Sequence, residues 1–202
     1  MAKYDLPATI YYILNQTGDE QLFYVGHSQG TAIAFARFSE DQELASRVKH
    51  LMALAPIGRV GNMTSPPLLL LVPFAKEIKS RSDVYLSHVP AGASALTLMQ
   101  WVQGVKSGQF QHFDYGEQEN LVKYGQKTPP LYNPRKVKVP VAIFRGGRDW
   151  LADTSDVEWL LPQLNVTHDI YVPFYQHLDM TYGFDAVTRM YKYIVNIVMG
   201  KD

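Results

Sequence analysis

The sequence predicts a layered α/β fold in which a mainly parallel sheet carries helices on both faces. Two observations support this prediction. Short apolar runs that suit buried strands alternate along the chain with segments of helical periodicity, and such alternation is typical of parallel sheets with crossover helices. In addition, the strand pattern at residues 22–26 leads directly into residues 26–30, Gly-His-Ser-Gln-Gly, a Gly-x-Ser-x-Gly turn that precedes a helix-compatible run.

The composition is that of one globular core. The chain has 202 residues, of which 47% are hydrophobic, and this is enough for a single sizeable domain. Nineteen basic residues balance nineteen acidic ones without a marked Lys/Arg cluster. Neither nucleic acid nor an anionic membrane surface is therefore expected as an electrostatic partner. The chain contains no cysteine, which excludes disulfides and a thiolate nucleophile.

Neither a transmembrane segment nor a signal peptide is expected in this chain. The longest apolar run, at residues 66–74, is shorter than the ~20 residues that a helix needs to span a bilayer. Residues 1–7 lead into no apolar core of the kind that follows a charged start in secretory signals.

The first third of the chain predicts two helices and two strands. The apolar spacing of residues 5–14 indicates an amphipathic helix that ends at Gly18. Residues 22–26 follow as a strand, and residues 30–38, which mix small and apolar side chains, as a helix packed on the sheet. The apolar run at residues 48–55, closed by a proline, suits a second buried parallel strand.

The regular pattern is interrupted in the middle of the chain. Residues 58–87 are interpreted as an excursion from the sheet. They include four leucines at 68–71, which either contact the sheet or form an apolar surface that meets acyl chains or a lipid interface. A helix is expected to resume near Ala91 and to end before Gly108, and residues 115–134 are expected to form a loop.

The last third predicts the return of the sheet. Residues 139–144 and 168–174 are expected to form strands, and residues 155–164 a helix between them with acidic residues in its first turn. A final amphipathic helix is expected to carry one apolar stripe. Its members are Phe184, Val187, Met190, Tyr191, Ile194, Val195 and Val198.

Ser28 is the candidate nucleophile. A strand that reverses sharply into a helix holds its serine at a strained backbone position, with the hydroxyl clear of the sheet. Gly26 and Gly30 are expected to leave room where the strand and the helix approach each other. The alternative is that the motif is merely a turn, as most chance matches to this pattern are.

A nucleophilic serine needs an acid and a histidine, which open α/β sheets place in that order at strand ends. Asp149 follows one predicted strand behind two glycines and is the candidate acid, and His177 follows the next strand and is the candidate base. Asp153 and Asp156 are alternatives for the acid. Both lie towards a helix start, where a carboxylate commonly serves as a cap or first-turn charge.

The other five histidines lack this setting. His27 adjoins the serine but is expected to point elsewhere on the turn. The remaining four have no strand-end position in the right order: His50, His88, His112 and His168.

Six segments carry a family resemblance. They are MAKYDLPATI (1–10), YVGHSQG (24–30), ALAP (53–56), DVYLSH (83–88), LAD (151–153) and YQHLD (175–179). Together they resemble the acid lipase family, which comprises the gastric and lysosomal acid lipases. The resemblance implies an α/β-hydrolase fold and hydrolysis of neutral lipid esters, either triacylglycerols or cholesteryl esters, with Ser28, Asp149 and His177 as the catalytic triad. It also implies an oxyanion donor at the backbone N–H of Gln29, contact with a lipid interface, and no metal or cofactor.

The chain departs from the family pattern. By comparison with that pattern, the chain is expected to lack the N-terminal strands and the His-Gly loop that supplies a second oxyanion donor, and to have a shortened cap between residues 57 and 83. We therefore expect a truncated member with residues 22–26 as an exposed apolar edge. We divide the chain into three parts. Residues 1–57 are expected to hold the nucleophile turn, residues 58–134 an abbreviated cap and return helix, and residues 135–202 the acid and histidine.

Two functions remain open at this point. One is a serine lipid esterase, and the other is a catalytically weak or silent isoform that acts as a binding protein. The resemblance implies a secreted or lysosomal location. The Asn-x-Thr triplets at Asn15, Asn62 and Asn165 would be glycosylation acceptors in that pathway.

Overall fold

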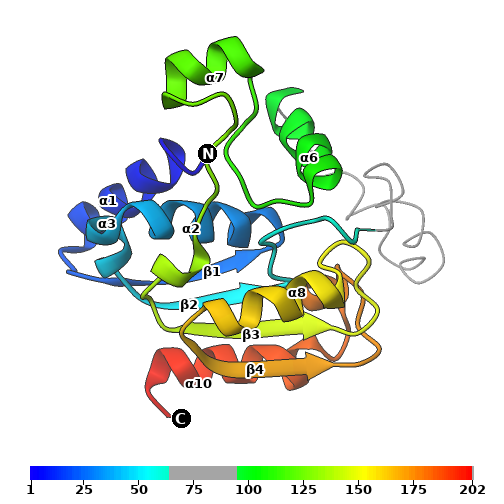
Figure 1. The fold of residues 1–202 in the computed structure, drawn as a ribbon. Coiled ribbons are helices and arrows are strands. Elements are labelled where there is room, and N and C mark those ends of the chain that lie inside the picture. Colours follow the sequence, from blue (N-terminus) through cyan, green and yellow to red (C-terminus); the bar gives the residue numbers. More distant parts are fainter. Residues whose placement is uncertain (64–94, 202) are drawn as a thin grey trace.

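The computed structural model describes residues 1–63 and 95–201 and shows an α/β fold. Within these residues, parallel strands pair in the order β1-β2-β3-β4 (Figure 1). The strands are β1 (Leu22–His27), β2 (Val48–Leu54), β3 (Val141–Gly146) and β4 (Val166–Val172). Of these strands, β1 and β4 lie at the edges. This confirms the expected edge position of residues 22–26, where the side chain of Val25 is 53% exposed.

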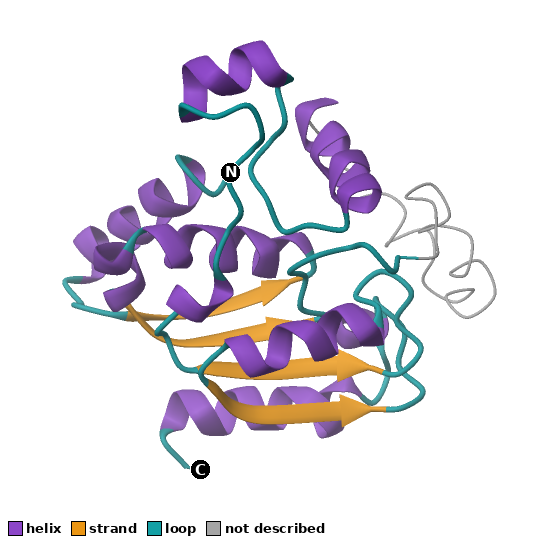
Figure 2. Ribbon diagram, viewed as in Figure 1, coloured by secondary structure: helices purple, strands orange, loops and turns teal. Residues whose placement is uncertain are grey.

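Helices cover both faces of the sheet, as predicted. One face carries α1 (Asp5–Thr17), α2 (Gln29–Glu40), α3 (Gln42–Ser46) and α8 (Thr154–Leu160). The opposite face carries α9 (Asp179–Tyr182), the π-helical turn η4 (Val187–Tyr191) and α10 (Lys192–Met199). Figure 2 shows α8 in front of the strands and α10 behind them. Short 3₁₀ turns lie at η2 (Pro134–Lys136) and η3 (Leu161–Gln163), and α6 (Ala95–Ser107) and α7 (Glu117–Tyr124) lie above α2, away from the strands.

The core consists of two apolar layers, one on each face of the sheet. Successive strand residues point to opposite sides, so Leu51 of β2 packs in the layer with α1 and α2, and Met52 in the layer with α10. In β3 the same alternation separates Ile143 from Phe144. Because both faces are covered, residues 51–54 of β2 and 141–144 of β3 appear in the sequence as continuous apolar runs.

The expected loop at residues 115–134 is wrong, because α7 lies within it. The side chain of Asn120 organises this helix: it accepts the backbone N–H of Tyr115 at 3.0 Å and donates to Asp114 at 2.7 Å. Gly125 then ends the helix in a left-handed conformation with φ of 71°. Acidic residues in the first turn and a glycine after the last are ordinary helix signals, so α7 could have been read from the sequence.

The final amphipathic helix is also only partly as expected. A π-helical turn, η4, precedes α10, and such a turn rotates the residues that follow it relative to those before it. Met190 of the expected stripe is buried, and so is Ile197, which the stripe did not include, whereas Phe184 is 92% exposed. Three more members of the stripe are exposed: Val187, Val195 and Val198.

Some expectations fall on residues 64–94, outside the described part of the chain. These are the leucine run at 68–71, most of the excursion at 58–87, the start of the helix near Ala91, and His88. In residues 1–63 and 95–201, no helix combines the length and hydrophobicity that crossing a membrane requires.

Candidate active site

Ser28 occupies a strained turn between β1 and α2. Its φ of 54° and ψ of −117° lie outside the backbone regions that residues other than glycine favour. Such a conformation costs of order 1–3 kcal/mol in strain and persists only where the surrounding structure holds it in place. The surroundings do so here: the Ser28 N–H donates to Leu54 O at 3.0 Å, and the N–H and hydroxyl of Thr31 donate to Ser28 O at 2.9 and 2.6 Å. The strand-turn-helix expected from the motif is therefore present.

The two glycines of the motif differ in what they contribute. A Cβ on Gly26 would lie 2.9 Å from the Tyr24 ring and 3.0 Å from the backbone of Gly30, so a side chain there would collide. A Cβ on Gly30 would have only the Tyr24 hydroxyl nearby, at 3.7 Å, which is an ordinary contact. The expectation that both glycines are needed to leave room is right for Gly26 and wrong for Gly30.

Asp149 and His177 form a buried pair. The Nδ1 atom of His177 lies 2.9 and 3.0 Å from the two carboxylate oxygens of Asp149, and the two residues are 7% and 3% exposed. The backbone N–H groups of Leu151 and Ala152 also donate to Asp149, each at 2.9 Å. Because a carboxylate only accepts, Nδ1 of His177 carries a proton, and Nε2 of the neutral ring is left as an acceptor.

The close approach of two loops brings this pair together. The N–H of Arg148 donates to Tyr175 O at 3.0 Å. A Cβ on Gly146 would come within 2.3 Å of that same oxygen, and one on Gly147 within 2.5 Å of Pro173 O. Glycine is therefore required at both positions for the loop that carries Asp149 to contact the loop that carries His177.

A polar chain anchors the His177 loop to the segment before η4. The Tyr175 hydroxyl donates to Asp185 at 2.6 Å, and Arg189 pairs with the same carboxylate. The Arg189 guanidinium also lies 4.8 Å from the centre of the Phe174 ring. The hydrogen bond from Tyr175, and then that from Arg189, holds the pKa of Asp185 below its ordinary value, while burial raises the pKa of Tyr175.

His27 lies against His177, contrary to the expectation that it points away. Its Nε2 is 2.9 Å from the carbonyl oxygen of His177, and the two ring centres are 4.8 Å apart. Burial lowers the pKa of His27, and the charge of His177 lowers it further, against smaller opposing effects of that carbonyl and of Asp149. Among the described residues, no hydrogen bond joins the Ser28 hydroxyl to the His177 ring, so the contact between the serine turn and His177 is made through His27.

The alternative acids have other partners. Asp153 caps α8 by accepting the Ser155 N–H at 2.8 Å. Asp156 is 3% exposed and binds Arg59 at 2.8 Å and both the backbone and side-chain N–H groups of Asn62 at 2.9 and 2.8 Å. Asp156 therefore fixes the chain after β2 onto α8.

The other described histidines also have partners away from His177. His112 pairs with Glu40 at 2.7 Å and stacks on Tyr132 with ring centres 4.1 Å apart. His50 and His168 each lie 3.0 Å from the hydroxyl of Thr167.

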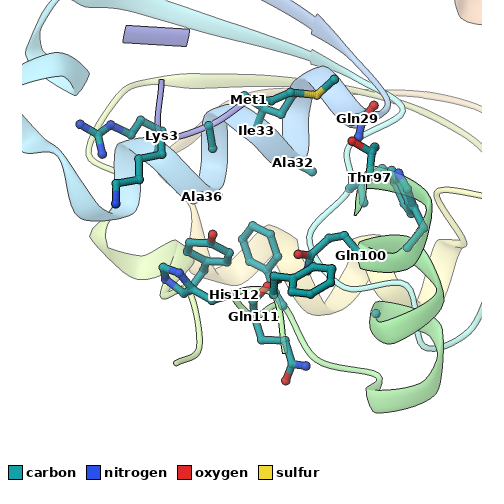
Figure 3. Close-up of a pocket in the computed structure, with 18 of the residues that line it drawn as sticks. Met1, Lys3, Gln29, Ala32, Ile33, Ala36, Thr97, Gln100, Gln111 and His112 are labelled. Carbon is teal, nitrogen blue, oxygen red and sulfur yellow. Dashed lines mark hydrogen bonds between the residues drawn. The ribbon is translucent and has the colours of Figure 1, made fainter. Parts of the chain in front are cut away.

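A pocket with a cavity volume of about 780 Å³ opens beside the serine turn. Gln29, the residue after Ser28, lines one end of it close to Thr97 of α6, and Lys3 lies at the other end (Figure 3). The pocket runs along α2, between this helix and the segment that carries His112. Its apolar lining comes mainly from α2, α6 and the segment before α7: Ala32, Ile33, Ala36, Trp101, Phe110 and Phe113.

Comparisons with known proteins agree with this fold. The model of the alpha/beta hydrolase fold family matches residues 1–83. An alpha/beta hydrolase enzyme from a deep-sea metagenome superposes with a TM-score of 0.51 at 14% identity, over 96% of this chain and 70% of that one. An alpha/beta fold family hydrolase from Bacillus anthracis superposes with a TM-score of 0.51 at 13% identity, over 97% of this chain and 74% of that one. In fold, the chain is an α/β hydrolase.

Relatives of higher identity narrow this class. Human lysosomal acid lipase/cholesteryl ester hydrolase is 39% identical over 249 residues, which cover 98% of this chain and 62% of that protein. Human gastric triacylglycerol lipase is also 39% identical, over 98% of this chain and 63% of the lipase. The chain thus spans less than two thirds of the length of these relatives. Over nearly its whole length the chain is similar to these acid lipases.

Two contacts of the site were missed from the sequence. Thr31, which is buried and bonded to Ser28, also accepts the N–H of Ile57 at 2.8 Å. The sequence shows that His27 adjoins Ser28, but it does not show the contact of His27 with His177, 150 positions away. The contact of Thr31 has a local signal, because a hydroxyl three residues after Ser28 is placed to bond the Ser28 carbonyl oxygen in the first turn of α2.

Proposed function

We propose that the protein is a serine hydrolase that cleaves carboxylic esters of neutral lipids. The observation that carries this proposal is the buried Asp149–His177 pair, with 2.9 Å between Nδ1 and the carboxylate, in contact with the strained turn that holds Ser28. A base oriented by a carboxylate beside a half-buried serine at a strand-helix turn is an arrangement that suits acyl transfer.

In the proposed mechanism the hydroxyl oxygen of Ser28 attacks the ester carbonyl while Nε2 of His177 takes its proton. Asp149 holds the Nδ1–H and stabilises the imidazolium that forms. The same proton then passes to the departing alcohol, leaving an acyl-enzyme that water cleaves by the reverse sequence. The backbone N–H of Gln29, at the start of α2, donates to the developing oxyanion.

The pocket gives a place for the apolar part of the substrate. Its volume of about 780 Å³ lies within the range of small-molecule sites, and its lining runs from Gln29 along α2 past Ile33. We assign an acyl chain to it, with the ester carbonyl at the Gln29 end. The related proteins are named for cholesteryl ester and triacylglycerol hydrolysis, and both esters are candidate substrates at a lipid interface.

The names of the relatives also suggest where the protein is located. In line with the names of its relatives, we assign the protein to the secretory or lysosomal route, with Asn15, Asn62 and Asn165 as glycosylation acceptors. Asn15 and Asn165 are exposed. The amide of Asn62 donates to the buried carboxylate of Asp156, so Asn62 is the least accessible of the three acceptors.

A catalytically weak or silent chain that acts as a binding protein is the second candidate. One observation favours it: in the described residues the Ser28 hydroxyl makes no hydrogen bond to His177, whereas an assembled nucleophile and base are within hydrogen-bond reach.

A fluorophosphonate probe distinguishes the two candidates. The purified 202-residue chain should be labelled at Ser28 and should hydrolyse a short p-nitrophenyl ester, and Ser28→Ala should abolish both. Ser46→Ala, an exposed serine at the end of α3, is the matched control and should behave as wild type. Labelling that survives Ser28→Ala, or a folded wild-type chain that is neither labelled nor active, contradicts the hydrolase proposal.

A further inference from the structure

His27 holds His177 at two points that the proposed mechanism does not use. Its Nε2 lies 2.9 Å from the His177 carbonyl oxygen, and its ring packs against the His177 ring at a tilt of 48° with centres 4.8 Å apart. The contact joins residues 150 positions apart in the chain. It therefore links the end of β1 to the loop after β4 across the whole sheet.

The proton positions in this contact follow from its chemistry. A carbonyl oxygen only accepts, so Nε2 of His27 carries the hydrogen that it donates to His177. Burial favours the neutral ring, because it lowers the pKa of His27. A neutral ring supplies the donor and the packing surface without placing a second full positive charge against the imidazolium that His177 becomes during proton transfer.

The position of His27 lets this contact affect both His177 and Ser28. Asp149 fixes His177 at Nδ1 on one side, and His27 fixes the main chain of the same residue on another. His27 is also the covalent neighbour of Ser28. One residue therefore sets the position of the base relative to the nucleophile, and misplacement of about 1 Å between reacting groups costs on the order of 10²-fold in rate.

We propose that His27 is a positioning residue, which sets the His177 ring relative to Ser28 through its Nε2–H···O=C bond and its ring contact. This inference rests on the proposed function, since it needs Ser28 and His177 to react as a pair. Packing alone would give a different result: a bulky apolar side chain would then serve as well as histidine.

Amide variants separate the hydrogen bond from the packing. In His27→Gln the side-chain N–H lies about as far from the backbone as Nε2 does, whereas in His27→Asn the chemically identical amide is too short to reach. We expect kcat for a short p-nitrophenyl ester, and the rate of fluorophosphonate labelling of Ser28, to fall about 10- to 100-fold in His27→Asn and His27→Leu. His27→Gln should recover most of the loss, and KM should change little in all three.

Two controls complete the experiment. His50→Leu makes the same chemical change in β2, away from the Asp149–His177 pair, and should leave kcat unchanged. Circular dichroism melts confirm that each variant is folded at the assay temperature, and if His27→Leu is unfolded the Gln and Asn variants alone decide. Equal labelling rates for folded His27→Gln and His27→Asn overturn the inference while the hydrolase proposal stands. A wild-type chain without Ser28-dependent labelling overturns both.

Discussion

The buried hydroxyl of Thr31 donates a 2.6 Å hydrogen bond to the carbonyl oxygen of Ser28 and accepts the N–H of Ile57 at 2.8 Å. One side chain thus ties the strained turn after β1 to the segment after β2. Since the strain at Ser28 persists only if neighbouring contacts hold it, Thr31 is a structural support for the proposed nucleophile.

We expect Thr31→Val to destabilise the protein by about 1–3 kcal/mol, because it keeps the shape of the side chain but leaves the buried Ile57 N–H without its acceptor. Urea unfolding at neutral pH measures the loss. Thr188→Val is the matched control, since that hydroxyl makes the same kind of bond, to Asp185 O, on the surface. Thr31→Ser should restore most of the stability, and a Thr31→Val protein as stable as wild type would contradict the role assigned to Thr31.

Substitution of the acid should separate Asp149 from Asp153. Asp149→Asn replaces the acceptor at Nδ1 of His177 and favours the wrong tautomer, and we expect kcat for a short ester to fall by roughly 10³- to 10⁴-fold. Asp153→Asn preserves a side chain that caps helices as well as aspartate does, so its kcat should stay within a few-fold of wild type. Steady-state kinetics on the two variants measure the difference. Equal losses would remove the assignment of Asp149 as the partner of His177.

The anchor of the His177 loop predicts a pH dependence of stability. The Tyr175 hydroxyl first, and Arg189 second, hold the pKa of Asp185 below its ordinary value of 3.8. A group whose pKa is depressed in the folded state stabilises it above the unfolded pKa and loses that effect as the pH falls through the folded one. Wild type should therefore be more stable than Asp185→Asn from about pH 5 upwards, and the two should converge in acid.

Urea unfolding of both proteins between pH 3 and pH 7 measures this difference. Asp179→Asn serves as a comparison in the same region, because Asp179 accepts the N–H of Gln176 rather than the Tyr175 hydroxyl. A constant gap between wild type and Asp185→Asn across the whole range would mean that the charge of Asp185 is not what stabilises the loop.

What the sequence predicts well here is what short-range periodicity encodes. The four strands and the cap role of Asp153 follow from patterns within about ten residues, whereas the triad of Ser28, Asp149 and His177 stays a prediction. Contacts such as His27 with His177 and Arg59 with Asp156 join residues 150 and 97 positions apart, and no local sequence pattern predicts them. The exposure of Phe184 has a local reason: it lies in the turn between α9 and η4, outside the helix that the apolar spacing predicts.

The pairing of β2 with β3 has a consequence for how this chain tolerates change. Leu54 and Val141 end and begin neighbouring strands, yet residues 55–140 separate them. Asp149 and His177 both follow this connecting segment and are positioned by β3 and β4. Insertions or deletions between the two central strands can therefore reshape the pocket, whose lining includes Trp101, Phe110 and Phe113, while the spacing of Asp149 and His177 stays constant.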